Sequence, residues 1–370
     1  MDLSVIIPAR NEEFLKLTID SILANIRGDT EIIAILDGYW PDPGIPMHPR
    51  VNLIHFEEPV GQRAGVNEGA RVSTAKYIMK LDAHCMVDEG FDVKLMADCE
   101  HDWTVIPRMY NLHAFDWQCT DCGHRTYQGP KPDKCQNFSW KCDICGEVWA
   151  QRYEPYDRPP KCKNRRCKNK TRFSEVDHKC SNAQRFDRVI VWQPRWNKKT
   201  DFMRFDDNMI FQYWRAYDGR PESKGDIADL MSSIGACFFM HRDRFFELGG
   251  MDEAHGSWGQ FGTEIACKSW LSGGRHVVNK KTWFAHMFRT KNKNEWGFPY
   301  AISGRQQQNA RKHSKDLWLN DKWPGAVRKL SWLIDKFAPI PDWPDQEKGS
   351  RIQGFEDSRV RGFKGRKERK

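Results

Sequence analysis

Apolar runs of strand length alternate with segments of helical periodicity through the first 81 residues, and this alternation constrains the fold more than any other feature. The predicted strands are 3–7, 31–36, 51–56 and 77–81, and the predicted helices are 11–26 and 62–74. This β-α-β-β-α-β order predicts an α/β domain with a mainly parallel sheet. Ligands of such sheets bind at the carboxyl ends of the strands. We therefore expect the chemistry near Pro8, Asp37 and Asp82, each of which follows a predicted strand.

A cysteine-rich segment interrupts this pattern. Eight of the 12 cysteines lie between Trp117 and Cys180, where apolar periodicity is lost and lysine, arginine and proline are frequent. Apolar runs return at 189–192 and 234–240. We therefore predict an α/β body formed by residues 1–116 and 185–300, an insertion at 117–184, and a helical stretch with a basic tail at 301–370.

The insertion contains two Cys-x-x-Cys-Gly motifs, which are typical of structural zinc sites because each presents two thiolates in a tight turn. Our preferred interpretation is two sites, of which the one that resembles a zinc ribbon is formed by Cys142, Cys145, Cys162 and Cys167. The other is formed by Cys119, Cys122, Cys135 and Cys180, with His178 as an alternative to Cys180. A second interpretation pairs the two motifs with each other. Neither leaves an obvious open coordination position, so we predict two structural Zn2+ ions.

Positive charge is concentrated in two segments. The chain has a formal net charge of +9, and residues 119–180 and 348–370 each carry a net +6, so the remaining residues are slightly acidic. Seven basic residues surround the last two cysteines of the predicted zinc ribbon: Lys161, Lys163, Arg165, Arg166, Lys168, Lys170 and Arg172. Two four-cysteine zinc sites would reduce the charge of the insertion to about +2. The asymmetry still favours contact with a polyanion.

Neither a membrane span nor a signal peptide is predicted. No apolar run approaches the roughly 20 residues that cross a bilayer, and residues 1–4 do not begin a basic and then apolar leader. We expect a soluble cytoplasmic chain, in which thiols stay reduced and clustered cysteines bind metal rather than form disulfides. An apolar content of 39% is sufficient for a packed core, so the class of wholly disordered proteins is excluded.

Asp82 and His84 form an Asp-x-His motif directly after the fourth predicted strand. Residues two apart in an extended chain project to one side, so a carboxylate and an imidazole could together bind one metal ion. Around this motif, residues 4–12, 36–38 and 61–69 resemble the family-2-type glycosyltransferases of the GT-A fold. The Asp-x-His form and the later segments 258–264 and 285–289 resemble those of the polypeptide N-acetylgalactosaminyltransferases.

The resemblance implies a GT-A fold, into which the zinc-ribbon module predicted from the cysteines would be inserted. Residues 1–116 would be the nucleotide-sugar-binding half and residues 185–300 the acceptor half. It implies a UDP-sugar donor and a divalent ion, with Mn2+ the first candidate, bound by Asp82, His84 and His286. It also implies that Asp37 binds uracil or ribose and Arg63 meets phosphate. Three more residues would line the nucleotide site: Pro8, Arg10 and Glu12.

Candidate catalytic residues are Asp82, Glu264 and Trp258. In an inverting enzyme Glu264 would be the base that deprotonates the acceptor hydroxyl, whereas in a retaining enzyme it would hold sugar hydroxyls. A third interpretation makes Glu264 a residue that opens a helix. Trp258 is expected to shape the acceptor pocket. The stereochemistry stays open at this point.

The basic tail, the zinc ribbon and the aromatic residues Trp192, Trp196 and Trp214 favour a nucleic-acid partner. Our leading hypothesis is sugar transfer to a hydroxymethylated pyrimidine base in DNA, which the enzyme would flip out of the duplex. A phage-encoded enzyme of the host cytoplasm would fit this hypothesis. The first alternative is transfer to a soluble glycan or protein. The second is a non-enzymatic nucleic-acid-binding protein on a GT-A scaffold.

Overall fold

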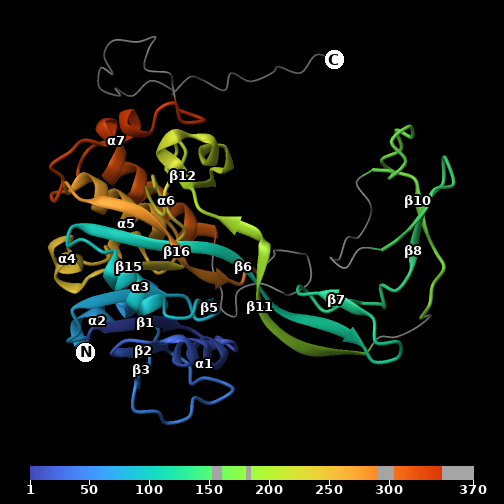
Figure 1. The fold of residues 1–370 in the computed structure, drawn as a ribbon, viewed down its shortest axis with the longest axis horizontal. Helices are drawn as coiled ribbons and strands as arrows, with labels where there is room; N and C mark the ends of the chain where they lie inside the picture. Colours follow the sequence, from blue (N-terminus) through green and yellow to red (C-terminus); the bar gives the residue numbers. More distant parts are fainter. Residues whose placement is uncertain (152–160, 181–184, 290–303, 344–370) are drawn as a thin grey trace, which may run out of the picture.

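A mixed sheet of 11 strands forms the centre of the body (Figure 1). The structure is a computed structural model that describes residues 1–151, 161–180, 185–289 and 304–343. The sheet order is β14-β16-β6-β15-β4-β1-β2-β3, while β5 pairs with β16, and β7 and β11 pair with β6. The strands are β1 (Leu3–Ala9), β2 (Thr30–Asp37), β3 (Val51–Phe56), β4 (Tyr77–Leu81), β5 (Cys85–Val87), β6 (Trp103–Cys119), β7 (Arg125–Tyr127), β11 (Phe186–Thr200), β14 (Ile227–Asp229), β15 (Cys237–His241) and β16 (Arg275–His286).

The half of the sheet built from the first 81 residues is parallel, as predicted. β1 pairs in parallel with β2 and β4, and β2 pairs in parallel with β3. The other half is mixed, because β15 runs antiparallel to β4 and β6 while β16 runs parallel to β6. Two parallel neighbours are joined by a crossover connection. β15 is not joined to β4 in that way, because the insertion lies between them in the chain. The sheet as a whole is therefore mixed rather than mainly parallel.

The helices are α1 (Leu15–Asn25), α2 (Gln62–Val72), α3 (Phe91–Ala97), α4 (Arg242–Glu247), α5 (Phe261–Leu271), α6 (Gly304–Leu319) and α7 (Leu330–Phe337), with short 3-10 helices η1 (Arg215–Gly219), η2 (Pro221–Ser223) and η3 (Glu253–His255). The first helix begins at Leu15 rather than at the predicted residue 11. Asn11 has a φ of 50°, and Glu12 Oε1 accepts a hydrogen bond from Phe14 N at 3.3 Å. The segment after β1 is therefore a turn that directs residues 10–12 away from the helix.

Two glycines allow α2 to lie directly on the sheet. A Cβ at Gly69 would lie 2.5 Å from Ile6 Cγ2 of β1, and a Cβ at Gly65 would lie 3.2 Å from Ile35 Cγ2 of β2. The first distance is too short for any side chain. The close contact fixes α2, which begins at Gln62, against the strands that end in the functional site.

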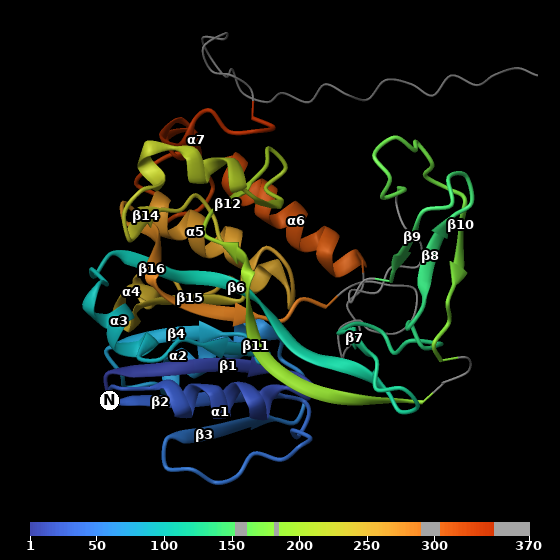
Figure 2. The same ribbon diagram turned by 45° about the vertical axis from the view of Figure 1, so that its right-hand side comes forward.

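The insertion is connected to the body by a two-stranded arm (Figures 1 and 2). β6 has 17 residues and β11 has 15, and they pair antiparallel along the arm. The boundary predicted between residues 116 and 117 falls inside β6, and the boundary predicted between 184 and 185 lies at the start of β11. The arm is thus a continuation of the central sheet rather than a separate linker.

A second sheet supports the insertion. It has the order β10-β8-β9 and consists of β8 (Ser139–Cys142), β9 (Val148–Ala150) and β10 (Phe173–Val176), all antiparallel. Phe138, Trp140 and Phe173 form its small core together with two buried cysteines. Both views place this module apart from the central sheet, on the side toward which β1 runs (Figures 1 and 2).

The C-terminal region contains the predicted helical stretch. α6 packs against η3, and α7 packs against α5. Earlier in the chain, β12 (Met203–Phe205) and β13 (Phe211–Tyr213) form a small two-stranded sheet. The basic tail at 348–370 lies outside the described residues. Within the described ranges, every helix is too short or too polar to cross a membrane.

Candidate active site

A pocket of about 380 Å3 lies at the carboxyl edge of the parallel strands. Eight residues predicted for the donor, metal and catalytic sites line it: Pro8, Arg10, Glu12, Asp37, Asp82, His84, Trp258 and His286. They come from the ends of β1, β2, β4 and β16 and from the segment before α5. The pocket therefore lies where α/β sheets generally bind ligands.

Asp82, His84 and His286 meet in this pocket. β4 ends at Leu81, and His286 is the last residue of β16, where it pairs with Cys85 of β5. His286 Nε2 lies 3.3 Å from Asp82 Oδ2 and 3.1 Å from His84 Nε2. One possible ligand atom from each of the three residues lies within 4.8 Å of the other two. The pairing of β5 with β16 thus brings together the residues that we predicted as one metal site.

The protonation states of these residues suit a cation. Burial lowers the pKa of His286 to about 4, so its ring is neutral at pH 7 and a nitrogen lone pair is available. Burial opposes the ionisation of Asp82, but the Lys80 ammonium and the two imidazoles hold its pKa below the usual range. One carboxylate oxygen and two imidazole nitrogens suit divalent transition-metal ions. The three residues therefore fit such an ion.

Glu12 orients the ring of His84. Its Oε2 lies 3.0 Å from His84 Nδ1, and both carboxylate oxygens accept hydrogen bonds from Arg289 at 2.7 Å. With Nδ1 bonded to a carboxylate, His84 presents Nε2 to His286, which is how carboxylates commonly orient metal-binding histidines. Glu12 lines the pocket, but its described side-chain partners are a histidine and an arginine. The sequence patterns did not reveal this role.

Two further residues hold Asp82 in place. Lys80 is fully buried in β4, and its ammonium contacts Asp82 Oδ1. Gln62 Nε2 donates a hydrogen bond to the same oxygen at 3.1 Å. Since both contacts use Oδ1, Oδ2 stays directed at His286. The signal that could have identified Lys80 is a single lysine inside an apolar strand, because a buried lysine needs a partner.

Asp37 fixes the loop that precedes α2. Its Oδ1 accepts hydrogen bonds from Val60 N at 2.6 Å and from Gly61 N at 3.2 Å. Gly61 has a φ of 90°, and a Cβ there would lie 2.8 Å from Ser257 Cβ, so this turn requires glycine. The carboxylate of Asp37 therefore has structural partners, and its contact with a nucleotide stays a prediction.

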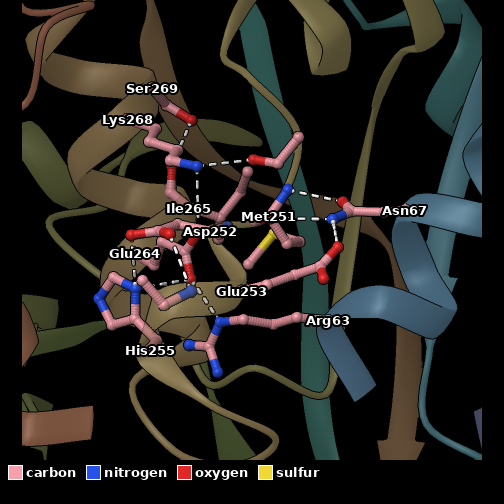
Figure 3. A network of polar contacts seen from close by, with 12 residues as sticks. Arg63, Asn67, Met251, Asp252, Glu253, His255, Glu264, Ile265, Lys268 and Ser269 are labelled. Atoms are coloured by element: carbon pink, nitrogen blue, oxygen red, sulfur yellow. Dashed lines mark hydrogen bonds and ion pairs between the residues drawn. The ribbon is translucent and has the colours of Figure 1, made fainter. Parts of the chain in front are cut away.

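Arg63 and Glu264 form a buried ion pair outside the pocket lining (Figure 3). Arg63 Nε donates to Glu264 Oε2 at 2.8 Å, and the other two guanidinium nitrogens donate to the carbonyl oxygens of Gly256 at 2.8 Å and Gly259 at 2.7 Å. Glu264 Oε1 accepts a hydrogen bond from Asp252 N at 2.6 Å. The pair thus anchors the loop that carries Trp258.

This geometry corrects two predictions. Arg63 does not meet phosphate, because it is buried and each guanidinium nitrogen has a protein partner. Glu264 is not placed to act as a base or to hold sugar hydroxyls, because it is fully buried. Burial opposes its ionisation, but Arg63 and Lys268 lower its pKa below the usual value. The interpretation closest to the structure is a residue in the first turn of a helix, here α5.

A second group of hydrogen bonds ties the same loop to α2 (Figure 3). Asn67 Oδ1 accepts a hydrogen bond from Met251 N at 2.8 Å, and Asn67 Nδ2 donates to Met251 O and to Glu253 Oε1, each at 2.9 Å. Together with the Arg63 contacts, these bonds fix residues 251–264 on α2. One wall of the pocket is therefore attached to α2, in the half of the body formed by residues 1–116.

The eight cysteines of the insertion form two clusters of four, in the sets that our preferred interpretation proposed. The Sγ–Sγ distances are 3.8 Å for Cys119–Cys180, 3.5 Å for Cys122–Cys135, 3.8 Å for Cys142–Cys167 and 3.6 Å for Cys145–Cys162. Four Zn–S bonds of about 2.3 Å in a tetrahedron separate the sulfurs by about 3.8 Å, so both clusters fit zinc. The alternative pairing of the two Cys-x-x-Cys motifs is wrong. His178 is not part of a cluster, and its Nε2 lies 3.7 Å from Glu175.

The chain is similar to known proteins in sequence and in fold. The family model described as Glycosyl transferase family 2 matches residues 4–112. The probable N-acetylgalactosaminyltransferase 9 of Caenorhabditis elegans is 29% identical over 99 residues, which are 27% of this chain and 16% of that protein. A crystal structure of GalNAc-T7 with UDP, GalNAc and Mn2+ matches with a TM-score of 0.56 and 15% identity, covering 91% of this chain and 56% of that chain. The chain therefore spans about half of one of these proteins and a smaller part of the other.

The likeness to GalNAc-T7 shows the fold alone, because the identity is 15%. It confirms the GT-A fold that the segments around the Asp-x-His motif predict. The family match covers β1, β2 and β4 and includes Asp82 and His84. The chain thus has a GT-A fold, and its residues 4–112 match the model of glycosyl transferase family 2.

Proposed function

We propose that this protein is a metal-dependent glycosyltransferase that moves a sugar from a UDP-sugar to an acceptor hydroxyl. The observation that carries the proposal is the meeting of Asp82, His84 and His286 in the pocket at the carboxyl edge of the sheet. Two of these residues lie in a glycosyl transferase family 2 domain. A protein of the same fold was crystallised with UDP and Mn2+, which supports that donor class and that ion.

Asp82, His84 and His286 would hold the divalent ion. When bound, such an ion neutralises the diphosphate of the donor as the glycosidic bond breaks. Glu12 keeps Nε2 of His84 directed toward the ligand position, and Lys80 holds Asp82 through the oxygen that faces away from His286. The role of these side chains is therefore to present three ligand atoms to the ion in an arrangement that exists before it binds.

Arg289 and Arg311 are better placed than Arg63 to meet the diphosphate. Both line the pocket, Arg311 from α6 and Arg289 three residues beyond His286. A guanidinium group matches phosphate oxygens with two parallel donors. Pro8, Arg10 and Asp37 line the same pocket and are proposed to contact the nucleoside.

The pocket favours transfer with retention of configuration. An inverting transfer needs a base that deprotonates the acceptor hydroxyl. In the described part of the chain, three carboxylates line the pocket, and all have partners: Glu12 binds His84 and Arg289, Asp37 binds two backbone amides, and Asp82 binds Lys80 and Gln62. Since Glu264 lies outside the pocket, these residues include no free carboxylate for that task.

We propose that the acceptor is a hydroxymethylated pyrimidine in DNA. The module formed by β8, β9 and β10 of the insertion lies on the side of the body where β1 ends (Figures 1 and 2). Its seven lysines and arginines between residues 161 and 172 are all exposed. Basic residues on a module that is separate from the pocket suit a long polyanion better than a small glycan. A base in a duplex would be flipped out to reach the pocket.

Each cysteine cluster is proposed to bind one structural Zn2+ ion. The sulfurs of both clusters have the spacing of a zinc tetrahedron. The core of the module is small, so metal binding would supply much of the free energy of its folding.

A transfer assay tests the function. The purified protein would be incubated with Mn2+ and a panel of UDP-sugars, with DNA containing hydroxymethylcytosine or hydroxymethyluracil as the acceptor. Mass spectrometry of the digested nucleosides should show the gain of one sugar, and NMR should show the donor configuration retained. Asp82→Ala should abolish the gain. Asp88→Ala should not, because Asp88 pairs with Lys94 and does not line the pocket.

The outcomes separate the alternatives. Donor hydrolysis without a gain on DNA would keep the transferase and reject the DNA acceptor, so that soluble glycans and proteins would be tested next. No reaction with any donor in the presence of Mn2+ would overturn the proposal. Binding of DNA without any reaction would then favour a non-enzymatic nucleic-acid-binding protein.

A further inference from the structure

A second cluster of one carboxylate and two histidines lies outside the pocket lining. Asp252 precedes η3, His255 ends η3, and His313 lies on α6. Asp252 Oδ2 lies 2.8 Å from His313 Nε2 and 3.2 Å from His255 Nδ1. One possible ligand atom from each residue lies within 4.8 Å of the other two. These distances resemble those of the Asp82 triad, although the residues and elements are different.

His255 is the unusual member of this cluster. It is buried, with 1% of its surface exposed, and neither ring nitrogen makes a hydrogen bond to a described residue. Buried polar groups in proteins almost always have a partner. Burial lowers the pKa of His255 to about 4, so the ring is neutral at pH 7 and its nitrogen lone pairs are available. A buried neutral imidazole beside a carboxylate and a second imidazole is the environment of a metal ligand.

We propose that Asp252, His255 and His313 bind one Zn2+ ion at a site that is separate from the donor pocket. Two imidazole nitrogens and one carboxylate oxygen are a donor set that zinc prefers, with a fourth position for water. Negative charge is available, because Asp252 keeps an ionised carboxylate through its contacts with His313 and Ala254 N. The nearby Arg63 is already neutralised by Glu264.

This ion would join the two walls of the pocket. The segment that contains Asp252 and His255 continues directly to Trp258. α6 provides Gln306 and Arg311 to the same pocket. Gln306 Nε2 of α6 donates a hydrogen bond to Ser257 Oγ of the loop at 3.4 Å, so the two walls are already in contact. Bound zinc would therefore fix α6 on the loop without contacting the donor.

The experiment measures zinc per chain by mass spectrometry of the metal. All proteins would carry Asp82→Ala, which removes the donor metal site from the count, and would be equilibrated with Zn2+ and desalted. His313→Ala and Asp252→Asn should each lose one zinc per chain relative to the parent. His313 is 34% exposed, and asparagine can keep the hydrogen bond from Ala254 N, so both variants should fold. Because each variant is compared with the parent, the expected loss of one zinc per chain does not depend on how fully the cysteine clusters are occupied.

His101→Ala is the matched control, because His101 is 56% exposed and lies 3.7 Å from Glu247. It should retain the zinc content of the parent. Circular dichroism of the zinc-free proteins should show the same helix and strand content for the parent and the His313→Ala variant, whose melting temperature should be slightly lower because it loses the hydrogen bond to Asp252. Equal zinc content in the parent and both test variants would overturn the proposal, as would the same loss in the His101→Ala control.

Discussion

His84 and His286 face each other through their Nε2 atoms at 3.1 Å, although 202 residues separate them in the chain. Glu12 binds the other ring nitrogen of His84. Two neutral imidazoles that direct lone pairs at each other repel unless a proton or a metal ion lies between them. Asp82 Oδ2 is 3.3 Å from His286 Nε2, so a negatively charged oxygen also lies beside these imidazole nitrogens.

Removal of either imidazole should abolish turnover. His84→Ala and His286→Ala each delete one ligand atom, and we expect activity to fall more than the about 10- to 100-fold loss that is typical of partners outside the ligand set. Zinc bound by the cysteine clusters should be unchanged, because they lie in the insertion. Steady-state donor turnover and metal content measure the two effects. His101→Ala, on the surface, should behave like the wild type. Loss of folding in both variants would favour a purely structural role.

Glu12 should act through His84 rather than on the donor. Glu12→Gln removes the charge that orients His84 Nδ1, and we expect the Mn2+ concentration for half-maximal activity to rise about 10- to 100-fold. Activity should recover at high Mn2+. Glu13→Gln is the matched control, because Glu13 pairs with Arg188. An unchanged dependence on Mn2+ with a raised KM for the donor would instead favour direct contact with the nucleotide.

The Arg63–Glu264 pair should matter for stability. Arg63→Met leaves a fully buried carboxylate with Lys268 at 3.1 Å as its remaining cation. Breaking such a pair typically costs about 3–5 kcal/mol, which urea unfolding would measure. Arg71→Met removes an exposed pair with Glu68 and should cost about 1 kcal/mol or less. A small effect of Arg63→Met together with a large loss of donor affinity would restore the phosphate role.

Local patterns were sufficient for the parallel half of the sheet and for the pairing of Asp82 with His84, whereas His286 was expected only from the family resemblance. β1 to β4 follow from apolar runs of strand length, and the Asp-x-His motif follows directly after one of them. Spacing predicted zinc sites, because Cys-x-x-Cys motifs form tight turns, but the choice between the two pairings depended on the resemblance of one set to a zinc ribbon. In these cases the relevant residues are close in sequence or lie at strand ends, which the topology of an α/β sheet brings to one edge.

The remaining features depend on long-range contacts. Arg63 and Glu264 are 201 residues apart, and only the docking of α2 on the 251–264 loop shows that they neutralise each other. An arginine is suited to bind phosphate and a glutamate is suited to act as a base, but the same two residues can also form a buried ion pair. The sequence could therefore not distinguish residues that line the pocket from residues that lie in the core. The arm was missed for a similar reason. β6 continues unbroken from the body into the insertion, and its partner β11 lies beyond 66 residues of irregular composition.

His276 should make stability depend on pH. It is fully buried on β16, neither ring nitrogen has a hydrogen-bond partner among the described residues, and burial lowers its pKa to about 3. The unfolded chain takes up this proton near pH 6.5, whereas the folded chain does so only near pH 3. Stability from this group is therefore complete above pH 6.5 and decreases as the pH falls from 6.5 toward 3, by about 1.4 kcal/mol per unit.

The substitution His276→Phe should reduce this slope by about one proton. Urea unfolding between pH 5 and 6.5 would measure it, a range in which carboxylates contribute less. His101→Phe should leave the slope unchanged, because His101 is exposed. Equal slopes for the wild type and His276→Phe would mean that the folded chain protonates His276 as readily as the unfolded chain.

The basic cluster of the module should determine the salt dependence of DNA binding. Each phosphate that a lysine or arginine neutralises contributes about 0.9 to the slope of log K against log salt. Substitution of Arg165, Arg166 and Lys168 by glutamine should therefore reduce the slope by about 2 to 3, while donor hydrolysis without DNA stays unchanged. The matched control removes three charges from the body through Arg50, Arg71 and Lys94, which lie in ion pairs there. Fluorescence anisotropy with labelled DNA would measure both slopes. Equal slopes for the two triple variants would show that net charge rather than the module governs binding, and the DNA acceptor would lose its structural support.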